Sequence, residues 1–136
     1  PNAQYDVEFA LTLVSNAGTG CFGIGGAPGE SVTIKGGVVG VEPATRIEGD
    51  YYRYTLDIGS QTEIGPDAID LGNMANGVPC EEEARWVSLE RTGMRGAPVT
   101  ADASGRLWLF VGSDSGYEGT TEYWVDRLEV TLTPRS

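Results

Sequence analysis

Apolar and polar residues alternate along several short segments of this chain, with the period of a half-buried β-strand. Between Tyr5 and Val14 every odd-numbered residue as far as Leu13 is apolar, and Asp6 and Glu8 lie between them. The alternation predicts further strands over residues 31–35, 51–58, 85–91 and 122–133. The run at residues 107–111 is apolar at every position, which predicts a central strand. No segment of a dozen residues shows a helical period.

The amino-acid composition limits the possible folds. The chain has 136 residues, 20 of them glycine and 7 proline, so turns are frequent and one domain over residues 1–136 is expected. These features predict an all-β domain, a two-sheet antiparallel β-sandwich, with a jelly roll as its topology.

The formal net charge of −11 restricts the possible partners. An acidic surface repels phosphate backbones, which argues against nucleic-acid binding and against anionic membranes. No apolar run is long enough for membrane insertion. The chain begins at Pro1 without a methionine, which favours a mature or excised domain.

Two cysteines, Cys21 and Cys80, allow only one intramolecular pairing. The glycine-rich β composition favours a disulfide in an oxidising compartment, and hence an extracellular or periplasmic protein. The alternative is two buried free thiols in a cytosolic protein.

The chain has no histidine, which excludes Ser-His-Asp and Cys-His catalysis and histidine-ligated zinc. A glycan-active enzyme would have to use paired carboxylates, for example within Glu81–Glu83 or between Glu118 and Glu122. The side chains of three adjacent glutamates point in different directions and do not form an acid and nucleophile pair. We therefore expect that the protein is not an enzyme.

Aromatic side chains near polar ones suggest a sugar-binding surface, because flat rings stack on sugars while polar groups bond the hydroxyls. The candidate ligand-binding residues are Tyr51, Trp86, Tyr117, Asp114 and Glu118. The alternative is that most aromatic side chains of the chain belong to the core, and a core position is the preferred interpretation for three others, Trp108, Phe110 and Trp124.

Asp126 has the same parity as Trp124, Leu128 and Val130, which predicts that its carboxylate points toward an apolar face. A carboxylate in that position needs a partner. The candidates are an arginine such as Arg53, backbone N–H groups, or a metal ion.

The ending Tyr123, Trp124, Val125, Asp126 and Leu128 resembles the C-terminal strands of jelly-roll carbohydrate-binding modules. The resemblance implies a structural calcium ion held by Asp126 together with Asp6 or Glu8, and a sugar-binding function.

The function expected from the sequence is therefore non-catalytic glycan binding by an extracellular domain that calcium stabilises. The alternative is a structural or interaction module of a surface protein, such as an adhesin or an assembly subunit, whose partner is another surface protein or a second copy.

Overall fold

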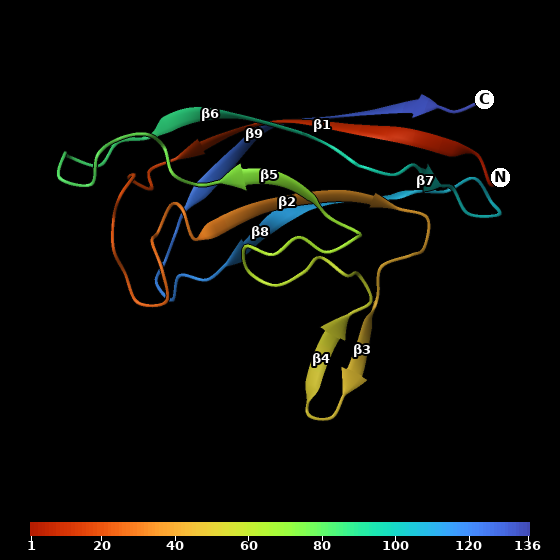
Figure 1. The fold of residues 1–136 in the computed structure, drawn as a ribbon, viewed down its shortest axis with the longest axis horizontal. Coiled ribbons are helices and arrows are strands. Elements are labelled where there is room, and N and C mark those ends of the chain that lie inside the picture. Colours follow the sequence, from red (N-terminus) through yellow and green to blue (C-terminus); the bar gives the residue numbers. More distant parts are fainter.

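A computed structural model describes residues 1–136 and consists of strands and loops without a helix (Figure 1). This confirms the all-β prediction. The strands are β1 (Gln4–Ser15), β2 (Val32–Val39), β3 (Thr45–Glu48), β4 (Tyr51–Tyr54), β5 (Ile69–Asn73), β6 (Val87–Met94), β7 (Val99–Thr100), β8 (Trp108–Ser115) and β9 (Tyr123–Pro134).

Two antiparallel sheets pack together as a sandwich, as predicted. In the first sheet β1 lies between β9 on one side and β6 with β7 on the other. In the second sheet β2 lies between β5 and β8. The segment at 107–111 was expected to be a central strand, which is wrong: β8 is an edge strand, and β2 is the strand buried on both faces. The jelly-roll topology stays a prediction.

The core lies between the inward faces of β1 and β2. Phe9, Leu11 and Leu13 of β1 are at most 2% exposed, and Ile34 and Val38 of β2 pack in the same cluster. Burying a side chain of this size stabilises a fold by about 1.5–3 kcal/mol. The inward side chains of β1, which the period of two predicts, therefore provide much of the contact between the two sheets.

A β-bulge interrupts the pairing of β1 with β9. Thr12 lies opposite Arg127, but Leu13 lies opposite Val125, so Asp126 is the extra residue. The bulge reverses the alternation before it: Val125 shares the inward face of Leu13, and Trp124 pairs with the outward Val14.

Two expectations fail for this reason. Asp126 is exposed and, as the extra residue of the bulge, has no partner on β1, so the parity that predicts an inward carboxylate does not hold there. Trp124 is 68% exposed and does not belong to the core.

Cys21 and Cys80 form a disulfide, with an S–S distance of 2.06 Å, as predicted. It joins the loop that follows β1 to the loop that follows β5. Such a bond points to an oxidising environment outside the cytoplasm. The protein contains no helix with the length and apolar character needed to span a membrane.

Strands β3 and β4 form a hairpin that projects from the sandwich (Figure 1). We call this hairpin, Thr45–Tyr54, the arm. A two-residue turn joins its strands, and Gly49 at the first turn position has φ 60°, as a type II′ turn requires. The strand predicted over residues 51–58 ends at Tyr54, because the chain turns there into the loop over β2.

Candidate functional site

The five residues predicted to bind a ligand do not form one site. Tyr51 lies on the arm and Trp86 directly precedes β6. Asp114 lies near the end of β8, and Tyr117 and Glu118 follow that strand. These residues therefore have separate surroundings in the fold.

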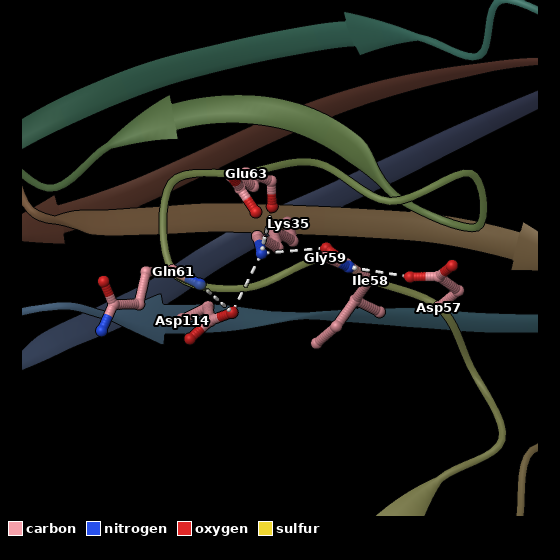
Figure 2. Close-up of polar contacts among 7 residues, drawn as sticks. All are labelled: Lys35, Asp57, Ile58, Gly59, Gln61, Glu63 and Asp114. Carbon is pink, nitrogen blue, oxygen red and sulfur yellow. Dashed lines mark hydrogen bonds and ion pairs between the residues drawn. The ribbon is translucent and has the colours of Figure 1, made fainter.

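Asp114 forms an ion pair with Lys35, the one lysine of the chain (Figure 2). The Lys35 side chain is only 3% exposed, and its Nζ lies 2.9 Å from Asp114 Oδ2. Nζ also donates hydrogen bonds to the carbonyl oxygens of Ile58 and Glu63, both at 2.9 Å. All three donors of the ammonium group thus have acceptors, as a buried charge requires.

This cluster fastens the loop Asp57–Asp67 over the outer side of β2. The backbone N–H of Gln61 donates to Asp114 Oδ2 at 2.8 Å, and the N–H of Gly59 donates to Asp57 Oδ1 at 3.3 Å (Figure 2). Asp114 Oδ2 thus accepts from both Lys35 and Gln61 and links this loop to β8 and β2.

Tyr117 is half-buried and packs against the core cluster. Its ring fills the space beside Gly23 and Gly119, where an added Cβ would collide with it. The ring therefore packs within the loop that follows β8.

The three predicted calcium ligands lie apart. Asp6 is opposite Thr133 and forms an ion pair with Arg135 at 2.9 Å. Glu8 is opposite Thr131, whereas Asp126 lies at the bulge beyond Thr12. No group of three His, Cys, Asp or Glu side chains is arranged to hold a metal ion. Calcium binding stays a prediction.

The outward side of the first sheet carries a different set of side chains, which we call the outer face. Its residues come from three neighbouring strands and follow from the register of β6, β1 and β9. Read along β1, the rows are Met94–Glu8–Thr131, Thr92–Ala10–Glu129, Glu90–Thr12–Arg127 and Ser88–Val14–Trp124.

The outer face is hollowed at its middle. Ala10 has a short side chain between the longer ones of Thr92 and Glu129, which leaves room above the sheet. Two adjoining hollows of about 330 and 230 Å³ share Ala10 and Glu129 in their walls. Together they run along β1 from Glu8 to Thr12.

Two tryptophans border one end of the outer face. Trp124 lies beside Val14 and is 68% exposed. Trp86 is 46% exposed and precedes β6 by one residue. The alternation from Ser88 assigns Trp86 to the same side of the sheet. Of the predicted ligand-binding residues, Trp86 is thus the one that meets this surface.

Hydrogen-bonding groups fill the rest of the outer face. Thr12 Oγ1 donates to Glu90 Oε1 at 3.0 Å, and Arg127 Nη2 donates to Glu129 Oε2 at 2.6 Å. Glu8 is exposed beside them. Three carboxylates and one guanidinium give this surface an excess of negative charge, which suits a neutral polyhydroxylated ligand and repels an anionic one.

A third hollow, of about 430 Å³, lies where the arm meets the sandwich. Its charged side chains are already engaged with the protein. Arg95 Nη1 donates to the carbonyl of Val38 at 2.8 Å, and Asp67 Oδ2 accepts from the N–H of Asp57 at 2.7 Å. The outer face is the stronger candidate, because it combines two adjoining hollows with two exposed tryptophans and the exposed Glu8.

Sequence reasoning missed Trp124 because strict alternation places it inward. Detecting the bulge would have required the register between β1 and β9, which connects the two ends of the chain. No known protein family, curated protein or solved structure matches this chain.

Proposed function

We propose that this protein is a non-catalytic glycan-binding domain whose binding surface is the outer face of the β6–β1–β9 sheet. The single observation that supports this most is the pairing of an exposed tryptophan, Trp124, with a hollow that runs along the same face. An exposed indole presents a flat apolar ring for stacking, and sugar rings have matching flat apolar faces.

In this proposal the ligand lies along β1. A sugar ring stacks on Trp124 or Trp86, and neighbouring units occupy the hollow above Ala10. Glu8, Glu90 and Thr131 accept from or donate to the hydroxyls. The ligand class is a neutral oligosaccharide, since the excess of carboxylates repels sulfated and uronic sugars.

A glycan-array screen followed by calorimetry tests the proposal. We expect binding of neutral oligosaccharides, and we expect Trp124→Ala to weaken it tenfold or more, which corresponds to about 1.4 kcal/mol. Trp86→Ala is expected to weaken the same interaction. Tyr51→Ala is the matched control, because Tyr51 is 70% exposed but lies on the arm.

Two results would overturn the proposal: a wild-type protein that binds no glycan, or tryptophan variants that bind as tightly as wild type. A loss on Tyr51→Ala with full binding by Trp124→Ala would move the site to the arm.

The same titration in calcium and in EDTA tests the predicted calcium stabilisation. If calcium takes part, Asp126→Asn is expected to remove its effect on the thermal unfolding midpoint. An unchanged calcium effect in that variant would exclude Asp126 as an essential ligand. An extracellular or periplasmic location belongs to the same proposal, and the disulfide supports it.

A further inference from the structure

The arm is amphipathic, although neither of its faces packs on the sandwich. Thr45 pairs with Tyr54 and Ile47 with Tyr52, so these four residues share one face. On that face Ile47 is 69% exposed, Tyr52 77% and Tyr54 70%. A two-stranded hairpin is marginally stable alone in water, and it gains stability when its apolar face is covered.

The opposite face of the arm is charged and internally paired. Arg46 and Arg53 both form ion pairs with Glu48, at 2.8 and 3.7 Å, and the Arg53 guanidinium lies 5.9 Å from the centre of the Tyr51 ring. This face is suited to water. The apolar face of the arm is therefore the one suited to contact with another apolar surface.

The sandwich has a matching apolar strip where its core remains open. Leu109 pairs with the buried Val38, and Leu128 and Val125 pair with the buried Leu11 and Leu13, so all three side chains point between the sheets. They are nevertheless 50%, 38% and 51% exposed. We call this strip, between the edge strands β8 and β9, the open side.

The other side of the sandwich is closed. Arg91 of β6 reaches the end of β5, where its Nη2 donates to the carbonyl of Asn73 at 2.9 Å. Gly93 of β6 lies so close to β5 that an added Cβ would meet Ile69 at 2.7 Å. On the open side the comparable link is at one end, where the Tyr123 hydroxyl donates to Ser113 Oγ at 3.2 Å.

The formal charge of the arm supports the arm of a second copy as the occupant of the open side. The arm holds two of the nine basic residues and two of the twenty acidic ones, so its formal charge is zero and the net −11 lies outside it. Copies of so acidic a chain repel one another over most of their surface. A neutral, apolar arm can approach a second copy with the least repulsion. The exposed apolar face of the arm also fits an exposed apolar strip of the same chain.

We propose that the protein self-associates by arm exchange: the apolar face of the arm of one copy packs on the open side of another. The contact covers Ile47, Tyr52 and Tyr54 on one copy and Leu109, Val125 and Leu128 on the other. It goes beyond glycan binding and uses none of the residues of the outer face. The arm projects away from its own sandwich, so a second copy provides the contact (Figure 1).

Sedimentation velocity over a concentration series tests the proposal on the full chain. We expect the wild type to self-associate, and Tyr52→Ser or Ile47→Ser to weaken association tenfold or more. Tyr51→Ser is the matched control: it removes an equally exposed tyrosine from the charged face of the same hairpin and is expected to associate like wild type.

Variants of the open side complete the test. Leu109→Ser and Leu128→Ser are expected to weaken association as the arm variants do, with circular dichroism confirming that each remains folded. A mixture of Tyr52→Ser, which retains the open side, with Leu109→Ser, which retains the arm, is expected to form a one-to-one heterodimer. If Leu109→Ser fails to fold, the mixture is made with Leu128→Ser.

The proposal is wrong if the wild type stays monomeric at its highest soluble concentration. It is also wrong if Tyr51→Ser weakens association as strongly as Tyr52→Ser, or if the mixture of arm and open-side variants stays monomeric.

Discussion

The ion pair between Lys35 and Asp114 should respond differently to the loss of each partner. The Lys35 side chain is 3% exposed, whereas the Asp114 side chain is 27% exposed. Removing the carboxylate by Asp114→Ala leaves a buried ammonium without a counter-charge. Removing the ammonium by Lys35→Met leaves a carboxylate that water can reach.

The magnitudes follow from this difference in exposure. A buried charge that loses its partner costs about 3–5 kcal/mol. Lys35 keeps the carbonyls of Ile58 and Glu63 as acceptors, so we expect Asp114→Ala to cost about 3 kcal/mol. Hydration of the remaining carboxylate limits the cost of Lys35→Met to about 1–2 kcal/mol.

Urea denaturation of the two single variants and of the double variant measures these costs. In a double-mutant cycle the double variant should cost less than the sum of the single variants, with a coupling of about 1–2 kcal/mol. A Lys35→Met variant that is destabilised as much as Asp114→Ala would refute the argument from exposure. A coupling below about 0.5 kcal/mol would show that the pair does not hold the loop. Asp114→Asn serves as a variant of nearly unchanged shape.

Two further predictions concern the loops. Replacing both Cys21 and Cys80 with serine should lower the free energy of unfolding by about 4 kcal/mol, because the bond closes a loop of 59 residues, and calorimetry of both proteins measures this. The pKa of Asp102 lies below its ordinary value of 3.8, first because the backbone N–H of Arg106 bonds its carboxylate, and further because of the Arg106 side chain and the N–H of Ser104. Ionised Asp102 therefore stabilises the fold above pH 3.8. The difference in unfolding free energy between wild type and Asp102→Asn should shrink as the pH falls below that value. A difference that stays constant down to low pH would contradict this assignment.

Much of the strand content could be predicted from local alternation. The period of two in β1 identified the inward positions of Phe9, Leu11 and Leu13, since neighbouring residues in an extended chain point to opposite sides whatever the rest of the fold does. The single possible cysteine pairing identified the disulfide. The turn Gly49–Asp50 between two short β-rich runs is a hairpin signal that could have predicted the arm.

The candidate site could be predicted only in part. Local alternation predicts Trp124 in the core, whereas it is exposed, and no local pattern indicates that Asp114 forms an ion pair with Lys35. Both features depend on partners far away in the sequence. Lys35 and Asp114 are 79 residues apart, and no local pattern connects them.

Short strands around an apolar core follow from the amino-acid sequence alone, because alternation and turn residues act over a few neighbouring positions. The side of β9 that faces solvent depends on long-range pairing, because one extra residue at Asp126 reverses the alternation, and the free energy of that bulge depends on the contact with β1. The same holds for β8 and β9, which are edge strands with core residues left uncovered. Strand order and register are set by contacts between distant segments, and these contacts assemble both the outer face and the open side.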